Sequence, residues 1–193
     1  DERTQAFQSA KRFYTSTPST EDGGIWQLFH KGDQRYYHCP CPHCNELIRF
    51  EWPQVTWDQS AKDEKTEQWD YQRVLASAHY VCQRCGGKIA DAHKTKMLRA
   101  GVWIPSNPTP LPGWRSYHLN SIYSVSLTFG RLAVKWLEAK HGDSLSELQN
   151  FINSSLAEPW KDRAISIKEE QLAPLCGATE REWQAVTGTG EVW

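Results

Sequence analysis

Two Cys-x-x-Cys sequences, Cys41-Pro42-His43-Cys44 and Cys82-Gln83-Arg84-Cys85, constrain the fold of this chain more than any other feature. The spacing lets both sulfur atoms of one turn reach a single metal ion, and two such turns complete a tetrahedron of thiolates. Four protein ligands leave no position for water or substrate. The pattern therefore predicts one structural zinc ion per chain, held by Cys41, Cys44, Cys82 and Cys85.

The residues that follow the two cysteine pairs support this prediction. A turn of this kind places its next residue in the left-handed backbone region, which glycine adopts without steric cost and asparagine next most easily. Asn45 follows the first pair, and Gly86 and Gly87 follow the second. Residues 45–81 separate the pairs, more than the roughly 15–20 residues of compact sites. We therefore expect an insertion and assign it to the charged residues 58–70, which carry little apolar surface.

Other interpretations of the cysteines stay open. Free thiols and a redox dithiol are the alternatives to a metal site, and Cys39 lies close enough to Cys41 to replace it as a ligand in a shifted register. Disulfides are disfavoured, because the chain opens on polar residues without the basic start and apolar stretch of a secretory signal. Cys176 receives no role.

The composition describes a soluble protein. The hydrophobic fraction is 39% and the charged fraction 23%, and no apolar run approaches the ~20 residues of a membrane helix, so we expect no membrane partner. A formal net charge of −1 disfavours strong non-specific binding of nucleic acid. A local basic patch remains a candidate, although a solvated helix face explains it more simply; its members are Lys88, Lys94, Lys96, Arg99 and Arg115.

The ten tryptophans, spread from Trp26 to Trp193, are expected to fill small cores and the seams between elements. Stacking of unpaired bases on exposed rings is the alternative. Three histidines have no carboxylate or nucleophile at motif spacing, so we nominate no catalytic residue; they are His43, His79 and His118. His43 is expected to project outward, and the other two to be partly buried in strands.

Hydrophobic periodicity and turn residues predict an α+β fold, in which a small zinc-ribbon-like β module precedes two or three helices. Asp91 is expected to cap a helix through Arg99, and Gly101 to end it in the left-handed region. Leu145, together with later leucines, is expected to line the last long helix. Strands are predicted at 13–17, 35–41, 46–52, 78–81 and 88–89, an extended segment at 114–123, and helices at 25–29, 91–99, 132–140, 145–156 and 169–172.

Six segments in order carry a resemblance to a known family. They are Ser16-Thr17-Pro18, residues 33–44, residues 82–89, residues 96–103, residues 118–124, and residues 151–160 ending in Glu158-Pro159-Trp160. Over about residues 10–162 the chain resembles the middle of the large terminase subunit of lambda-type tailed phages. The N-terminal residues 1–30 are then the remnant of an ATPase core.

The resemblance implies a motor that packages viral DNA with ATP and cuts concatemeric genomes with a metal-dependent nuclease domain. It implies the terminase small subunit, the portal and viral DNA as partners, in the cytoplasm of the bacterial host. Ser16 and Thr17 correspond to a segment that couples nucleotide state to motion. ATP and Mg²⁺ are expected only for the full-length protein.

The chain departs from the family at both active sites. It has no Gly-x-x-x-x-Gly-Lys-Ser/Thr loop for ATP phosphates, and no aspartate follows Asp162, where the family's nuclease holds a divalent ion. We therefore expect neither a catalytic residue nor a small-molecule substrate in this chain, and interpret it as an internal fragment, a remnant or an excised module.

Five segments are expected: an ATPase-core remnant at 1–30, a ribbon at 31–104, a proline-rich connector at 105–113, a strand with a helical linker at 114–160, and a tail at 161–193. The leading hypothesis is a structural connector between the two enzymatic domains of a terminase. The alternative is a freestanding zinc-ribbon module that binds nucleic acid or a protein.

Overall fold

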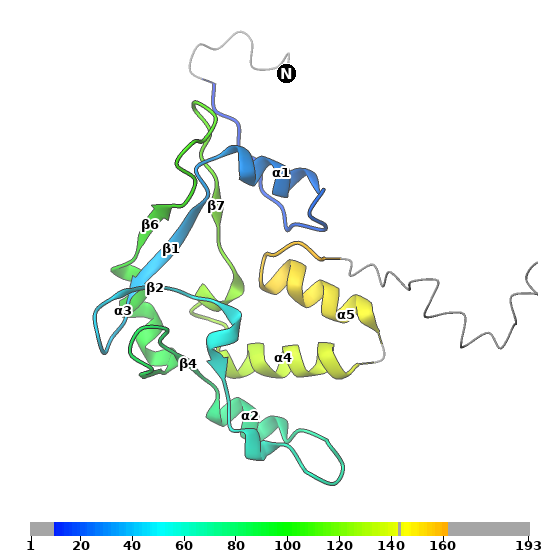
Figure 1. Cartoon of the computed structure of the whole chain (residues 1–193). Helices are drawn as coiled ribbons and strands as arrows, with labels where there is room; N and C mark the ends of the chain where they lie inside the picture. The colour runs from blue at the N-terminus through cyan, green and yellow to red at the C-terminus, as the bar shows by residue number, and fades with distance from the viewer. Residues whose placement is uncertain (1–9, 143, 162–193) are drawn as a thin grey trace, which may run out of the picture. The chain divides into compact units, whose positions relative to one another are not determined.

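The computed structural model describes residues 10–142 and 144–161 (Figure 1). The chain divides into two units, Asp1–Lys161 and Asp162–Trp193, and all described residues lie in the first. Two small sheets and several short helices make up the described part, which confirms the predicted α+β class. The helix predicted at 169–172 lies outside the described residues.

The first sheet is organised around β1 (Arg35–Pro40). Its C-terminal half pairs antiparallel with β2 (Leu47–Arg49). Its N-terminal half pairs antiparallel with β6 (Val102–Pro105) and parallel with β7 (Tyr117–His118). The strand therefore delivers the first cysteine pair at one end and joins segments from late in the chain at the other (Figure 1).

The second sheet has the order β3 (Val55–Thr56), β4 (His79–Val81) and β5 (Lys88–Ile89), all antiparallel. The second cysteine pair lies between β4 and β5, as the first lies between β1 and β2. Each pair thus occupies the turn of a two-stranded hairpin. This strand, cysteine turn and strand arrangement is the predicted ribbon.

Residues 47–51 show the predicted alternation, with Ile48 and Phe50 buried and Leu47 and Glu51 exposed. A half-buried strand turns alternate side chains to opposite faces. The side chains of Ile48 and Phe50 therefore face the core.

Side chains supply hydrogen bonds to the backbone just beyond β2. The Tyr80 hydroxyl donates to the carbonyl oxygen of Arg49 at 3.0 Å and accepts from the backbone N–H of Glu51 at 3.1 Å. Tyr80 is fully buried, and its ring packs 4.7 Å from that of Phe50, centroid to centroid. One residue of β4 thereby stabilises the chain where the first hairpin ends.

Most of the remaining regular structure is helical. Three-residue 3₁₀ turns occur at Trp52–Gln54, Gln59–Ala61, Asp91–His93 and Ser121–Tyr123. The helices are α1 (Gly24–Lys31), α2 (Tyr71–Ser77), α3 (Lys94–Arg99), α4 (Phe129–His141), α5 (Leu145–Asn150) and the π-helical η6 (Phe151–Ser155).

The insertion between the cysteine pairs is more structured than the charged residues 58–70 suggest. Residues 63–68 are exposed, as predicted, but Asp70 caps α2 by accepting from two backbone N–H groups. Val74 of α2 is buried and shares a hydrophobic cluster with Leu137 of α4. A Cβ atom on Gly130 would lie 2.4 Å from the Leu75 carbonyl oxygen. The absence of a side chain at Gly130 therefore lets α2 and α4 pack closely, as seen in Figure 1.

Four tryptophans fill the seam between this insertion and the helices. Trp52 lies 5.5 Å from Trp136 and 6.5 Å from Trp57, centroid to centroid, and Trp57 lies 6.0 Å from Trp69. Phe151 packs within 5.3 Å of both Trp52 and Trp136. For these rings the predicted packing role is confirmed, because their faces contact one another and are partly buried.

The predicted capping role of Asp91 is wrong. Its carboxylate instead accepts from the backbone N–H of Phe129, at 3.0 Å and 3.1 Å for the two oxygens, and so adds to the cap that Thr128 provides at the start of α4. Residues 91–93 form a 3₁₀ turn, and α3 begins only at Lys94. The Asp91 carboxylate therefore bonds to the start of α4, which is distant in sequence, instead of to the start of the neighbouring helix α3.

Gly101 is also explained differently. Among the described glycines, a positive φ occurs at Gly86 and Gly113, so Gly101 is not left-handed. A Cβ atom at Gly101 would lie 2.6 Å from the ring of Tyr37. The position requires glycine because the aromatic ring of β1 packs directly against the backbone.

Two further local predictions are wrong. Residues 13–17 form no strand, and the Phe13 side chain is 87% exposed. Leu145 is 68% exposed instead of lining its helix, because it lies at the first turn of α5, beyond the buried stripe that Leu156 joins. Ser144 caps α5 by accepting from the backbone N–H of Ser146.

The proline-rich residues 105–113 turn back along the start of β1. The backbone N–H of Leu111 donates to the Lys31 carbonyl at 2.9 Å, and that of Ser106 donates to the Asp33 carbonyl at 3.1 Å. The strands that flank this connector, β6 and β7, both pair with β1. The connector therefore joins two strands of one sheet.

Candidate metal centre

The four cysteines of the two hairpins converge on one point. Their sulfur atoms all lie within 4.8 Å of one another, with 3.9 Å between Cys41 and Cys85 and 4.0 Å between Cys44 and Cys82. A zinc ion bonded to four thiolates at about 2.3 Å gives a tetrahedron with edges of about 3.8 Å. The sulfur positions therefore fit a tetrathiolate centre.

The two turns repeat one backbone pattern. In the first, the N–H of Asn45 donates to the Cys41 carbonyl at 2.9 Å, and in the second the N–H of Gly86 donates to the Cys82 carbonyl at 3.0 Å. The φ angles are 62° at Asn45 and 70° at Gly86. The left-handed conformation predicted for the residue after each pair is therefore confirmed.

Gly87, which the sequence placed in the same class, has a different role. Its φ is not positive, and a Cβ atom there would lie 2.7 Å from the imidazole of His43. His43 is exposed, as expected, but its Nε2 lies 2.8 Å from the Lys88 carbonyl oxygen. The imidazole thus bridges the two hairpins, a contact that the sequence did not predict.

Backbone amides point at the sulfurs. The N–H of His43 donates to Cys41 Sγ at 3.5 Å, and the N–H of Arg84 donates to Cys82 Sγ at 3.4 Å. Burial raises the pKa of Cys41 to about 12. Burial acts in the same direction on Cys82, but hydrogen bonds from the N–H groups of Cys85 and Arg84, together with those from the neighbouring thiols of Cys41 and Cys85, outweigh it and lower the pKa of Cys82 to about 7. One thiol is thus prepared for deprotonation, and metal binding would release protons from the others.

Cys39 does not belong to this cluster. It is fully buried in the hydrophobic core, opposite Ile48 in the sheet, and burial raises its pKa to about 12. Among the described residues, the group of converging ligand atoms comprises Cys41, Cys44, Cys82 and Cys85; Cys176 lies outside the described residues. A shifted register with Cys39 in place of Cys41 is therefore not what the structure adopts.

The chemistry of the donor set fits zinc. Four thiolates are soft ligands, which select Zn²⁺ or iron and iron–sulfur centres over hard Mg²⁺ or Ca²⁺. With all four positions taken by protein, the ion would hold the hairpins together and leave no site for a substrate. Metal binding by Cys41, Cys44, Cys82 and Cys85, and the identity of the ion, stay predictions.

The other two histidines are partly or fully buried, as expected. His79 Nδ1 lies 2.8 Å from the Ser77 carbonyl. His118 Nε2 lies 3.0 Å from the Ala157 carbonyl, and its ring packs against those of Tyr36 and Phe29. Burial lowers the pKa of His118, and the charge of Arg49 acts in the same direction.

The candidate nucleic-acid residues do not share one environment. Lys94 is 1% exposed, and its ammonium bonds to the Asp91 carboxylate at 2.8 Å and the Leu127 carbonyl at 2.7 Å. It also lies 3.9 Å from the ring centroid of Phe129. The prediction that Lys94 contacts a nucleic-acid backbone is therefore wrong, because its ammonium is buried. The exposed members are Lys88, Lys96, Arg99 and Arg115.

Ser16 and Thr17 are exposed, whereas Pro18 is buried. Just after this segment, the backbone is bonded to a residue from late in the described chain: the N–H of Trp160 donates to the Ser19 carbonyl at 2.9 Å. The coupling role of Ser16 and Thr17 stays a prediction.

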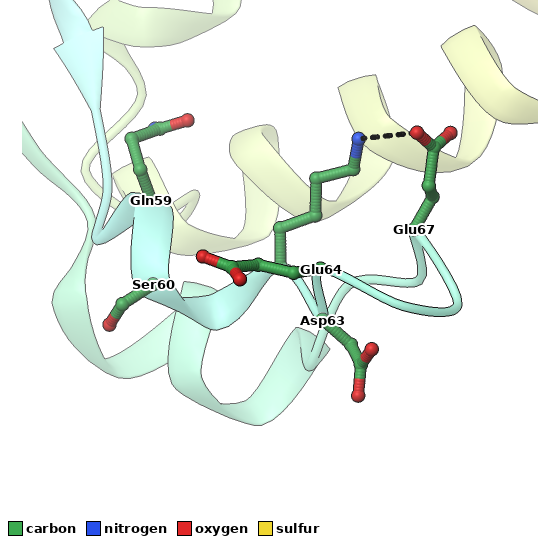
Figure 2. Close-up of a pocket in the computed structure, with 6 residues that line it drawn as sticks. Gln59, Ser60, Asp63, Glu64 and Glu67 are labelled. Carbon is green, nitrogen blue, oxygen red and sulfur yellow. Dashed lines mark ion pairs between the residues drawn. The ribbon is translucent and has the colours of Figure 1, made fainter.

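A shallow hollow lies over the tip of the insertion (Figure 2). In it Lys62 pairs with Glu67 at 4.0 Å, and both side chains are substantially exposed. The remaining lining residues are Gln59, Ser60, Asp63 and Glu64. Exposed acidic groups of this kind define no site, because no polar side chain is buried against a ligand position.

The hairpins and converging thiols define the class of the protein as an α+β chain with a zinc-ribbon-like cysteine centre. Two family models match it. One describes the phage terminase large subunit gpA, ATPase domain, over residues 1–103, and the other the terminase large subunit gpA, endonuclease domain, over residues 114–186. The chain belongs to the phage terminase large subunit gpA family, which gives it a role in phage DNA packaging. Searches of curated proteins and of solved structures return no match.

Within the described residues, no helix has the length and apolar character needed to cross a bilayer.

Proposed function

We propose that this chain is the zinc-ribbon connector of a phage terminase large subunit, which holds an ATPase domain and an endonuclease domain in register. The convergence of four sulfurs within 4.8 Å carries the proposal, because a closed tetrathiolate centre stabilises a fold without taking part in catalysis. An ATPase-domain model matches residues 1–103, which include all four cysteines, and an endonuclease-domain model matches residues 114–186, so the two matches support a position of the ribbon next to the junction of the two domains.

In this proposal catalysis belongs to other parts of a terminase. The sequence has neither a phosphate-binding Gly-x-x-x-x-Gly-Lys-Ser/Thr loop nor an aspartate beyond Asp162. ATP and Mg²⁺ then act only in the full-length protein. Ser16 and Thr17 transmit the nucleotide state, and the terminase small subunit, the portal and viral DNA are the partners, in the cytoplasm of the host. The five-segment division of the chain is part of the same proposal.

Metal analysis tests the proposal directly. We expect one zinc ion per purified chain, and loss of folded structure in the hairpins on chelation, because the binding energy of such a site is largely folding energy. Cys85→Ala should lose the zinc. Cys39→Ala is the matched control and should retain one ion per chain, since Cys39 lies outside the cluster. A metal-free chain with an unchanged fold would refute the proposal.

Binding of nucleic acid by a freestanding ribbon is the second candidate. The observation that favours it is the exposure of Lys88, Lys96 and Arg99 beside the second hairpin. Binding through phosphates predicts an affinity that falls steeply as the salt concentration rises. The slope of log affinity against log salt concentration should decrease in magnitude by about one for each phosphate contact removed. Lys96→Ala should reduce the slope, and an unchanged slope in that variant would exclude this patch as the binding surface.

A further inference from the structure

The segment that opens the endonuclease match, residues 114–129, is joined to both cysteine hairpins. Ser116 provides the first connection. Its carbonyl accepts from the N–H of Arg35 at 2.8 Å, and its hydroxyl donates to the Phe29 carbonyl at 2.7 Å. A Cβ atom on Gly32 would lie 2.3 Å from the Ser116 hydroxyl oxygen. The segment therefore begins as an integral neighbour of β1.

The second connection reaches the exit of the first hairpin. The backbone N–H of Phe50 donates to the Tyr123 hydroxyl at 2.9 Å, and the Phe50 carbonyl accepts from Asn120 Nδ2 at 3.0 Å. Phe50 is fully buried, and both partners are less than one tenth exposed. Both backbone polar groups of a buried ribbon residue thus depend on side chains from the endonuclease-matched segment.

The third connection starts from the second hairpin. Just after β5, Asp91 caps α4 through the N–H of Phe129, and Lys94 ties the Leu127 carbonyl to the same carboxylate. Lys94 is almost completely buried. The first turn of α4 is therefore held both by its N-cap residue Thr128, which accepts from the N–H of Arg131, and by residues that follow the second cysteine pair.

We infer that the four-cysteine centre acts as a positional switch for the start of the endonuclease-matched segment. Residues 114–129 bond to Phe50, just after the first hairpin, and to Asp91 and Lys94, after the second. A thiolate-bound ion would join the two hairpins in addition to the contacts of Tyr80 and His43. Loss of the ion loosens these two anchors, so the bond from the Phe129 N–H to Asp91 and the bonds of residues 114–129 weaken, while Thr128 still caps α4. The inference rests on the proposed metal binding and adds a metal-dependent control of the endonuclease side.

Hydrogen exchange of the full 193-residue chain tests this inference. Peptides from α4 are compared in zinc-loaded protein and in protein treated with a chelator. We expect chelation to accelerate exchange of α4 amides at least about tenfold, because local protection reports the free energy of local opening. If chelation removes the zinc ion but exchange of the α4 amides does not change, the inference is overturned, while the proposed metal site still stands. A chain that binds no zinc would instead refute the proposed function.

A variant isolates the connection from the metal. Asp91→Ala should keep one zinc per chain and still accelerate exchange in the first turn of α4. The matched control is Asp63→Ala, because Asp63 also accepts from two backbone N–H groups, those of Lys65 and Thr66, but lies in the exposed insertion. Equal α4 exchange in the two zinc-loaded variants would contradict the proposed anchoring role of Asp91.

Discussion

Tyr123 provides a quantitative test of how the described core is held together. Its hydroxyl accepts from the N–H of Phe50 at 2.9 Å and donates to the Tyr37 carbonyl. Tyr123→Phe keeps the ring, which packs 5.0 Å from the Phe50 ring, but removes both hydrogen bonds. Each of the two backbone groups left buried without a partner costs about 1–3 kcal/mol, so the free energy of unfolding should fall by about 2–6 kcal/mol.

Urea denaturation of zinc-saturated protein measures this loss. With a slope of about 2 kcal/mol/M for a chain of this size, the midpoint should fall by about 1–3 M while the slope stays the same. Tyr117→Phe is the control, because the Tyr117 side chain is 51% exposed, and its effect should stay within about 0.5 kcal/mol. Equal midpoints for the two variants would refute the role assigned to the Tyr123 hydroxyl.

Three further predictions concern single residues. Gly86→Asn should keep zinc and nearly full stability, because Asn45 occupies the equivalent left-handed position, whereas Gly86→Val should cost at least about 1–2 kcal/mol; thermal denaturation distinguishes them. Gly130→Ala should destabilise the fold, because its Cβ would meet the Leu75 carbonyl, and no loss in the melting temperature would contradict the packing of α2 on α4. Burial lowers the pKa of His118 below its ordinary value of 6.5. As the pH falls through about 6.5, His118 therefore takes up a proton in the unfolded chain but not yet in the folded chain. This difference lowers the free energy of unfolding as the pH falls. His118→Gln should reduce the difference in stability between pH 7.5 and 5.5 by up to about 1 kcal/mol, and an equal difference in both proteins would refute the assignment.

The convergence of four cysteines could be predicted from sequence because every signal for it is local. Ligand spacing within each Cys-x-x-Cys turn, and the need for a left-handed residue at Asn45 and Gly86, depend on a few neighbouring residues. The alternation of Ile48 and Phe50 is likewise a property of one short strand. Such local patterns do not show which turns come together in the fold. In this sequence there are only two Cys-x-x-Cys turns, so each has a single possible partner.

The positions that sequence reasoning missed depend on contacts between distant segments. A carboxylate before a helix looks the same whether it caps that helix or, like Asp91, one that starts 38 residues later, at Phe129. Lys94 reads as a solvated helix residue, yet a carboxylate and a backbone carbonyl satisfy its charge in the core. Gly101 fits a helix end by position, but the Tyr37 ring sets its requirement.

The proline-rich connector shows the same limit in another form. Proline content predicts a stiff, extended segment but not its direction. Hydrogen bonds from Ser106 to Asp33 and from Leu111 to Lys31 turn it back onto the sheet that it leaves. The segment that composition marks as a connector therefore stays bonded to the sheet that it leaves.

The hydroxyls that bind the backbone at residues 49–51 also tie one short stretch of chain to two distant parts of the sequence. Tyr80 comes from β4 and Tyr123 from the 3₁₀ turn at Ser121–Tyr123. Both rings are buried, and Phe50, whose N–H binds Tyr123, is fully buried as well. These residues can therefore reach their native conformation only once both distant segments are in place, which makes the formation of this part of the core a cooperative event.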